Sequence, residues 1–413
     1  MRVLGLMALS SVLLGCATQG VSHTELPSYY MAADPQTRLS QYVAKEQPAD
    51  ESLSGFTLLY KGNDALAARL KLIDMADQSL DIQYYIFNTD ITGGLIAEHL
   101  LKAADRGVRV RILLDDIGSS LEDMKVEVRL YNPLSLRNEW LKSLSTLGEF
   151  GRINYRMHNK LMVADNRALI TGGRNIGDEY FTLSDVDFQD VDVLGIGSIA
   201  DAASDSFDNF WNSGIASPIA TLAKQSDAEA LASMRATLGS RNLQLQHDPY
   251  LKAAARSPFI TDMSNGTLNW RWGHAEWFYD DPSKSDPHGD GNETAFLGRR
   301  LLEKLRASRS ELLLTSAYFV PLETGEDMLL DIHSQGVSIS VLTNSLATTD
   351  VLAVHSGYAK SRVSLLKGGL NIWELRPIAG QQERASPFLG ESLASLHAKT
   401  FVFDRKAVFI GSV

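Results

Sequence analysis

The sequence contains almost no cysteine, which limits the chemistry open to it. Cys16 is the only cysteine among 413 residues. A single cysteine forms neither an internal disulfide nor a cluster of thiolate metal ligands. No other group of residues indicates a metal site, so we expect neither a metal nor a cofactor.

Basic residues are also scarce relative to acidic ones. Lys and Arg total 39 against 50 Asp and Glu, which gives a formal net charge of −11. Proteins that bind nucleic acid or anionic membranes over a broad surface need a basic face, so this balance counts against nucleic acid as a partner. A local basic field could still oppose the net charge. The sequence identifies no protein partner.

The apolar run at the N-terminus is too short to cross a membrane. From Val3 to Leu14 it spans only ~18 Å as a helix, whereas the hydrocarbon core of a bilayer is about 30 Å thick. Arg2 precedes this run, and Leu13-Leu14-Gly15-Cys16 ends it. This combination is typical of a cleaved lipoprotein signal.

Cys16 is therefore the predicted lipidation site. After cleavage, a diacylglyceryl group on this residue would hold the protein at a membrane of the bacterial cell envelope. Ala17 follows it rather than an aspartate, and by resemblance to bacterial lipoproteins this favours the outer membrane, facing the periplasm. The alternative is a spare cysteine in a cleaved signal peptide. We expect residues 1–16 to form the signal and residues 17–53 a polar tether.

One short motif occurs twice. In each copy a lysine follows a histidine by two positions and an aspartate follows the lysine by five, and the copies lie 239 residues apart. They are His158, Lys160 and Asp165 in the first half, and His397, Lys399 and Asp404 in the second. Small residues follow each histidine at the same distance, Gly172-Gly173 and Gly411-Ser412. Two half-sites that face one substrate explain this duplication better than core packing does.

Two histidines with two lysines suit displacement at a phosphodiester. One imidazole can attack phosphorus while the other protonates the leaving alkoxide, with a covalent phosphohistidine between the two steps. The lysines can bind the non-bridging oxygens and stabilise the negative charge of the transition state. This chemistry needs no metal.

These residues resemble the phospholipase D superfamily, whose signature is the doubled His-Lys-Asp motif. The resemblance runs from about Phe56 to Val413 and is strongest to the bacterial cardiolipin synthases. Further segments carry it in both halves, namely Asp81–Ile86, Gly107–Arg111, Gly172–Tyr180, Ser316–Pro321 and Leu342–Leu346. It implies two similar α-β-α sandwich domains with mixed or mainly parallel sheets, and an active site at their interface.

Alternating strand and helix patterns agree with two α/β domains. The first half predicts a strand over Ser79–Phe87, a helix over Gly93–Ala104 and a strand over Val108–Leu114. The second half repeats this plan over residues 311–319, 325–334 and 337–343. A further helix is predicted over Ile199–Trp211. We expect domains over residues 54–212 and 263–413, joined by a connector over residues 213–262.

Each motif is predicted to begin a strand, over Asn159–Ala164 and Ala398–Phe403. Side chains alternate between the two faces of a strand, so a histidine and the lysine two residues later point the same way. The spacing therefore places both side chains of each half-site on one wall of a cleft.

The two histidines have opposite tasks in the expected mechanism. The motif is symmetric and does not show which histidine attacks. By resemblance to superfamily members in which the first-half histidine attacks, we assign attack to His158 and acid–base catalysis to His397. Lys160 and Lys399 are assigned to phosphate binding.

Other residues are assigned supporting tasks. Asp165 and Asp404 are either catalytic or structural carboxylates that hold a turn. Gly173, Asn175 and Ser412 occupy positions where small residues of the superfamily contact phosphate or join the two halves.

A catalytic imidazole needs a partner on its other ring nitrogen. Asp190, 32 residues after His158, lies in a run that resembles the orienting acid of the superfamily. Asp192 is the alternative, because it lies on the same face of the same strand. A plain exposed strand aspartate is a further alternative.

Two segments between the motifs have open interpretations. The aromatic stretch Trp270–His274 could line a lipid channel or pack at a buried edge. The polar segment Asp280–Asn292 is expected to be a surface loop with an edge that could face substrate.

The sequence ends two residues after Gly411, where the superfamily continues with an asparagine and more of the second half-site. Asn175 is the corresponding residue of the first half. We therefore expect the second domain to be incomplete at its C-terminus.

The sequence thus predicts a membrane-tethered phosphatidyltransferase that makes cardiolipin. The resemblance implies phosphatidylglycerol as acceptor and phosphatidylethanolamine as donor. A hydrolytic phospholipase D or a nuclease could use the same two histidines, although the net charge counts against the nuclease. A lipoprotein that binds lipid without turnover is the alternative outside enzymes.

Overall fold

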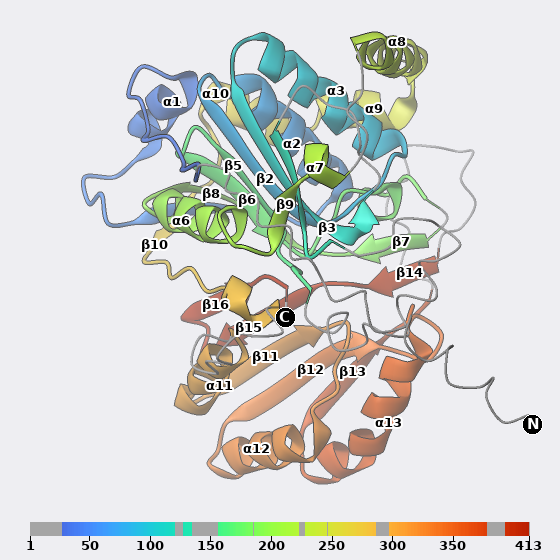
Figure 1. The fold of residues 1–413 in the computed structure, drawn as a ribbon. Coiled ribbons are helices and arrows are strands. Elements are labelled where there is room, and N and C mark those ends of the chain that lie inside the picture. Colours follow the sequence, from blue (N-terminus) through green and yellow to red (C-terminus); the bar gives the residue numbers. More distant parts are fainter. Residues whose placement is uncertain are drawn as a thin grey trace, which may run out of the picture.

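Both halves of the chain fold as the alternation of strands and helices predicts. The computed structural model describes residues 27–119, 127–133, 156–184, 186–222, 228–245, 247–285, 297–377 and 393–412. Two units lie one above the other (Figure 1), each built on its own sheet. This confirms the expected class of two similar α/β units. The predicted lipidation site, Cys16, lies outside the described residues.

The first unit is built on a mixed sheet of nine strands. In sheet order these are β10 (Arg271–Gly273), β1 (Ser54–Leu59), β8 (Asp192–Gly197), β6 (Ala168–Gly172), β5 (Leu161–Ala164), β2 (Ser79–Phe87), β3 (Arg109–Ser119), β4 (Glu127–Tyr131) and β9 (Ala216–Pro218). Strands β2, β3 and β4 pair in parallel, whereas β5 and β6 run antiparallel to their neighbours.

The second unit repeats the centre of this sheet with five strands. In sheet order these are β13 (Asn371–Leu375), β12 (Ser338–Asn344), β11 (Glu311–Ser316), β15 (Lys399–Phe403) and β16 (Ala407–Ile410). Their order and directions match β4, β3, β2, β5 and β6. The two motif strands, β5 and β15, therefore occupy the same place in their sheets.

The helix that connects β2 to β3 has both ends set by local sequence. This helix is α3 (Ile91–Asp105), and the Asp90 side chain caps it by accepting a hydrogen bond from the Gly93 amide at 3.0 Å. The chain leaves it through Gly107, whose φ of +92° favours glycine. The matching helix of the second unit, α12 (Leu322–Ser334), is followed in the same way by Gly336 at +94°.

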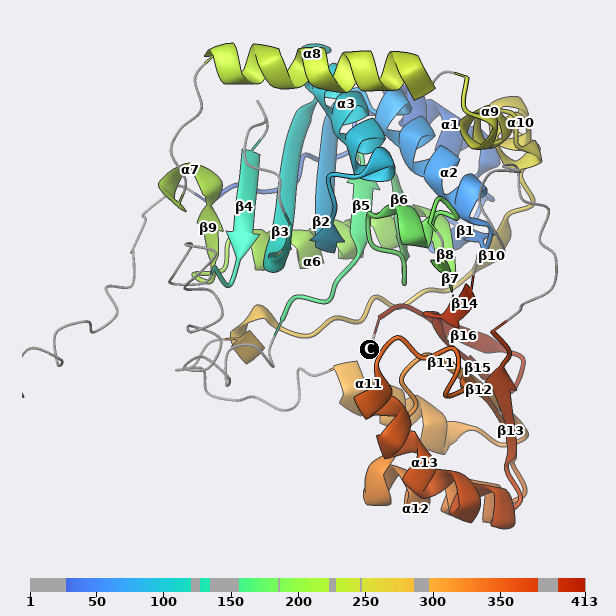
Figure 2. The same cartoon turned by 90° about the vertical axis from the view of Figure 1, so that its right-hand side faces the viewer.

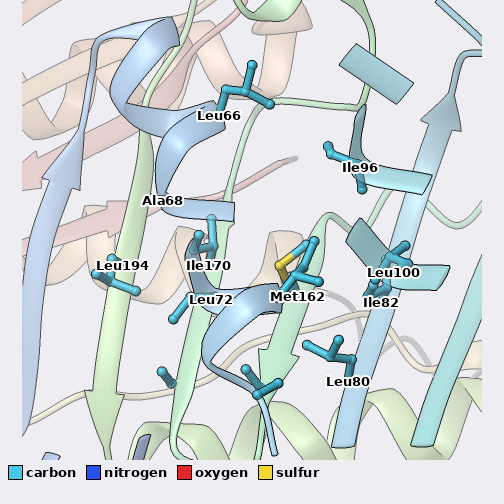
Figure 3. Packing of buried hydrophobic residues seen from close by; sticks show 14 of the residues in the cluster. Leu66, Ala68, Leu72, Leu80, Ile82, Ile96, Leu100, Met162, Ile170 and Leu194 are labelled. Carbon is cyan, nitrogen blue, oxygen red and sulfur yellow. The ribbon is translucent and has the colours of Figure 1, made fainter. Parts of the chain in front are cut away.

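Alternation along the motif strand β5 supplies two hydrophobic cores. Met162 belongs to the largest cluster, formed with α2 (Gly62–Met75) and α3, and Figure 3 shows Leu72 and Ile170 near it. The next residue back, Leu161, belongs instead to a cluster with Phe207 on α6 (Ile199–Trp211). Helices cover both faces of the first sheet, as α3 and α6 show in Figure 1, and the motif strand β5 is therefore apolar and buried at every position.

The second unit has a core of its own. Helices α11 (Leu297–Ala307), α12 and α13 (Leu352–Lys367) share one cluster with the sheet. Leu312, Leu314, Ile339 and Val341 supply the sheet's part of it, at alternate positions of β11 and β12. Each motif strand is therefore supported by a separate core.

The segment expected to be a connector packs on the first unit. Strand β9 adds to one edge of the first sheet beside β4, and β10 adds to the other edge beside β1. Between them lie α7 (Ile219–Leu222), α8 (Ala228–Leu245), α9 (Pro249–Ala255) and α10 (Pro258–Asn265). The first sheet therefore reaches Gly273, beyond the boundary expected at residue 263.

A two-stranded parallel sheet joins the units. Strand β7 (Val186–Gln189) of the first unit pairs with β14 (Leu393–Leu396) of the second, and Figure 2 shows this pair between the units. The Gln189 carbonyl then accepts hydrogen bonds from the amides of His397 and Ala398 at 2.9 and 3.1 Å. Because β14 leads directly into the second motif, this pairing places His397 against the first unit.

A buried arginine fastens the start of the described chain to the first unit. Arg111, on β3, donates to Asp81 at 2.6 Å and to the Ser28 carbonyl at 2.8 Å, and its Nη2 lies 2.7 Å from Asp208 Oδ1. The Tyr30 amide donates to the other oxygen of Asp208 at 2.7 Å. From residue 28 onward, the segment expected to be a tether is thus bound to the domain, and it also forms a helix, α1 (Arg38–Glu46).

Arg111→Leu should lower the free energy of unfolding by about 3–5 kcal/mol, because Asp81 and Asp208 would be left buried without their cation. Urea unfolding followed by circular dichroism measures this loss. Arg235→Leu is the control, since Arg235 pairs with Asp105 at the surface and should cost less than about 1 kcal/mol. A loss for Arg111→Leu no larger than that of the control would contradict this account.

Candidate active site

Each motif histidine lies just before its strand, with the motif lysine beside it. Lys160 Nζ donates to the His158 carbonyl at 2.8 Å and lies 3.4 Å from His158 Nδ1. In the second unit Lys399 Nζ donates to the His397 carbonyl at 3.3 Å. The two-residue spacing thus places histidine and lysine together in both halves, although β5 and β15 begin at Leu161 and Lys399, later than the strands expected from Asn159 and Ala398.

The two motifs meet in one site. His158 Nδ1 forms a hydrogen bond with the hydroxyl of Ser412, which belongs to the second unit. The charges of Lys399 and His397 are among those that lower the pKa of His158. The structure therefore brings His158, Lys160, His397, Lys399 and Ser412 together, as the duplication of the motif predicts.

Each histidine is oriented by the opposite unit. His397 Nδ1 lies 2.7 Å from Asp190 Oδ2 in the first unit, and Ser412 of the second unit contacts Nδ1 of His158. Because a carboxylate accepts, Asp190 requires a proton on Nδ1 of His397, so the neutral ring keeps its lone pair on Nε2. In both rings Nδ1 is occupied, which leaves Nε2 for chemistry.

Aromatic rings fix the position of both half-sites. The Tyr85 ring lies 4.8 Å from the His158 ring, and Lys160 Nζ lies 5.6 Å from the Tyr85 centroid. Tyr318 takes the same place in the second half, 5.1 Å from Lys399 Nζ. These separations allow cation–π attraction. Both tyrosines lie in segments that carry the family resemblance, but the sequence assigned them no role.

The His397 ring is further enclosed by the first unit. Tyr180 meets it edge-on at 5.3 Å and Phe188 lies 5.2 Å away. Asn175 donates a hydrogen bond to the Tyr180 hydroxyl at 2.8 Å and accepts one from the Ile86 amide at 3.2 Å. Asn175, expected to contact phosphate or to join the two halves, is buried and contacts Tyr180, whose ring packs on His397 of the other unit.

Burial and like charge set the ionisation of the site. Burial lowers the pKa of His158 well below its usual value, and the neighbouring Lys160 and Lys399 lower it further. Burial, together with Lys399, also lowers the pKa of Lys160 strongly. Burial lowers the pKa of His397, but Asp190 opposes that effect. A bound anion would raise all of these values, since it favours each charged form.

Asp165 and Asp404 lie at the opposite ends of the motif strands from the histidines. Asp165 accepts hydrogen bonds from the amides of Asp77, Gln78 and Ser79, and Asp404 accepts those of Arg309, Ser310 and Glu311. Both have a positive φ, of 51° and 52°. Seven residues of extended chain span roughly 23 Å, so both aspartates match the structural interpretation and not the catalytic one.

Gly173 makes room for the orienting acid. A Cβ atom at this position would lie 2.0 Å from Asp190 Oδ1, so any larger residue would displace the carboxylate. The glycine expected to contact substrate thus serves Asp190. Asp192, the alternative orienting acid, instead pairs with Arg69 at 2.8 Å in the interior.

Arg174 is a supporting residue that the sequence interpretation missed. Its buried guanidinium donates to the carbonyls of Leu59, Tyr60, Tyr180 and Asp190, the last at 2.6 Å. It therefore holds the backbone on both sides of the His397 pocket. Its position in the sequence, between the candidate site residues Gly173 and Asn175, could have indicated that it lies near the site.

A cavity of about 1010 Å³ opens from the site between the two units. His158, Lys160 and Ser412 line it, whereas His397 and Lys399 do not. Both lysines are buried, with 3% exposure each, and His397 is 5% exposed. Trp272 and Trp277 belong to its aromatic wall. Arg271 to His274 thus face the cavity, whereas Trp270 packs in the largest core beside the edge strand β10.

No group of three or more potential metal ligands occurs in the part of the chain that the structure describes. Among the same residues, no helix is both long and apolar enough to span a bilayer.

Comparison with known proteins agrees with this geometry. A family model described as "Cardiolipin synthase, PLD-like domain" matches residues 70–211 and 301–413. Cardiolipin synthase C of Escherichia coli (strain K12) is 39% identical over 370 residues, which cover 87% of this chain and 77% of that protein. An uncharacterised protein of Helicobacter pylori (strain 26695) is 33% identical over 405 residues, covering 95% and 79%.

Among solved structures, the phosphatidylserine synthase of Haemophilus influenzae superposes with a TM-score of 0.49 at 13% identity, over 88% of this chain and 80% of that one. The family model and the relatives that align over most of the chain show to which family the protein belongs. The chain belongs to the cardiolipin synthase family of phospholipase D-like proteins.

Asp190→Asn should slow the first chemical step by roughly 10²–10⁴-fold, because an amide does not hold the same tautomer of His397. It should also move the alkaline limb of the kcat/KM profile to lower pH, because Asp190 raises the pKa of His397 and its loss lets that pKa fall. Steady-state rates between pH 5 and 9 test this. Asp105→Asn, at the surface, is the control, and an unshifted limb in Asp190→Asn would refute the orienting role.

Proposed function

We propose that this protein is a phosphatidyltransferase that joins two phospholipids into cardiolipin through a phosphohistidine. The observation that supports it most is the pair of imidazoles held through Nδ1, each with a lysine beside it, in one interdomain site. A phosphodiester needs a nucleophile, an acid and cations for its non-bridging oxygens. These four side chains supply all three.

In the first step, Nε2 of His158 attacks the phosphorus of the donor lipid. The bond from phosphorus to the headgroup oxygen breaks as the nitrogen–phosphorus bond forms, and His397 gives its proton to the departing oxygen. The phosphatidyl group is then attached to His158, and the headgroup leaves as an alcohol.

In the second step, the neutral His397 removes the proton from a hydroxyl of the acceptor lipid. The acceptor oxygen attacks phosphorus, the nitrogen–phosphorus bond breaks, and His158 leaves as neutral imidazole. His397 is again protonated, so the cycle returns to its starting state.

The electrostatics support attack by His158. Its strongly lowered pKa keeps the ring unprotonated, with a lone pair free on Nε2. The pKa of His397 is lowered less, because Asp190 favours its charged form. His397 is therefore the better proton carrier, and the phosphate anion would raise its pKa further.

The lipid substrates follow from the relative. Its name, cardiolipin synthase C, identifies cardiolipin as its product, and we extend that product to this chain. We assign phosphatidylethanolamine as donor and phosphatidylglycerol as acceptor. The aromatic wall of the cavity suits the apolar part of a lipid.

We also propose that a diacylglyceryl anchor on Cys16 holds the protein at the envelope, at the outer membrane facing the periplasm. The lipobox Leu13–Cys16 supports this. A lipid anchor would keep the site at the surface that contains its substrates.

With both lipids supplied, the full-length protein should form cardiolipin and free ethanolamine. His158→Ala and His397→Ala should each lower the rate by more than about 10²-fold, and mass spectrometry should find the acid-labile phosphoryl group on His158. Lys71→Ala, on α2, is the control. Phosphatidic acid as the main product would indicate a hydrolase instead, and cleavage of single-stranded DNA would indicate a nuclease. Lipid binding without any product would indicate a lipid-binding lipoprotein. An adduct on His397 would reverse the two roles.

Cys16→Ser should release the protein from membranes or leave an uncleaved precursor. Fractionation of cells and mass analysis of the mature N-terminus measure this. Wild-type protein recovered in the soluble fraction with its first sixteen residues intact would remove the lipid anchor.

A further inference from the structure

The proposed reaction brings two phosphates close together, and the motif lysines bind only the phosphate that is transferred. The acceptor phospholipid carries its own phosphate near the hydroxyl that attacks. Moving that second anion out of water is costly unless a cation meets it. A site that joins two phospholipids therefore needs a further cation, whereas a site that admits water does not.

Lys284 is a cation in the required place. It lines the same cavity as His158, Lys160 and Ser412, although it belongs to neither motif. Its charge has only a minor effect on His158, because burial, Lys160, Lys399 and His397 all contribute more to the lowered pKa of that ring. A third lysine near the two motifs thus comes from a different segment of the chain, and it shares the cavity with His158 and Lys160.

The structure holds Lys284 in position. Its ammonium pairs with Asp280, four residues earlier, and Asp280 also accepts a hydrogen bond from the Leu297 amide. The intervening turn is fixed from the first unit, where the Tyr131 hydroxyl donates to the Pro282 carbonyl at 3.0 Å. A side chain held this way loses little freedom when it binds a ligand.

The ammonium keeps capacity for a ligand. It has three donor hydrogens, and among the described residues only Asp280 accepts one. Around it, the charged residues of the cavity wall are mainly basic, namely Lys160, Arg271, Lys284, Lys304 and Lys406 against Glu276 and Asp280. The cavity is thus locally positive in a chain whose net charge is −11.

We propose that Lys284 binds the phosphate of the acceptor lipid and so selects an anionic phospholipid over water or a neutral alcohol. This inference rests on the proposed transferase function. Lys160 and Lys399 bind the phosphate of the donor lipid, which is transferred. Lys284 binds the phosphate that the acceptor lipid already carries.

The test compares two acceptors in mixed micelles with labelled phosphatidylethanolamine as donor. For Lys284→Met, the apparent KM for phosphatidylglycerol should rise about tenfold, as expected for loss of one charge-assisted hydrogen bond. Transfer to glycerol, which has no phosphate, should keep its wild-type rate and show that the variant is folded. Lys284→Arg should restore most of the preference for phosphatidylglycerol.

Lys102→Met is the matched control, because Lys102 forms an i,i+4 ion pair with Glu98 on the remote helix α3. It should behave as wild type with both acceptors. If Lys284→Met lowered transfer to both acceptors equally, or to neither, this inference would be wrong while the proposed function would stand. Inorganic phosphate could instead inhibit the wild type equally with both acceptors and fail to inhibit the variant. That result would show that Lys284 binds free phosphate and not the acceptor lipid. No transfer by the wild type to either acceptor would overturn the proposed function and this inference with it.

Discussion

The hydrogen bond between Asp190 and His397 is the interaction on which the site depends most. It crosses from one unit to the other at 2.7 Å, so the motif imidazole of the second unit is oriented only when the units are docked. The β7 and β14 pairing sets that docking, Gly173 leaves space for the carboxylate, and Arg174 holds its backbone. Strand β7, Gly173 and Arg174, all in the first unit, thus together determine the position of the His397 ring in the second unit.

Charge imposes a second constraint. Two buried amines, the buried His397 ring and the half-buried His158 ring share one site. Their pKa values fall because burial and nearby positive charge oppose protonation. The site is therefore electrostatically incomplete without an anion. A phosphodiester supplies what is lacking, and its binding would strengthen the charged forms that catalysis needs.

The duplicated motif led to both correct and mistaken expectations. Histidine and lysine lie together in each half because a spacing of two residues is local. The aspartate of the motif follows at a constant distance for another reason, since Asp165 and Asp404 tie the end of each motif strand to the start of its neighbour. Constant spacing marks a shared fold as readily as a shared reaction. The segment after residue 213 was expected to be a connector because Gly214 to Pro218 break the preceding helix, yet Tyr250 and Phe259 of this segment join the first core.

The sequence alone determined the α/β class, the two matching units and the histidine–lysine half-sites, because these follow from periodicity and short-range spacing. Only the tertiary structure decided that each unit orients the other's histidine, that Tyr85 and Tyr318 face the lysines, and that Lys284 joins the same cavity. These contacts link residues tens to hundreds of positions apart. They depend on how the units dock and how loops cross between them, which no local pattern encodes.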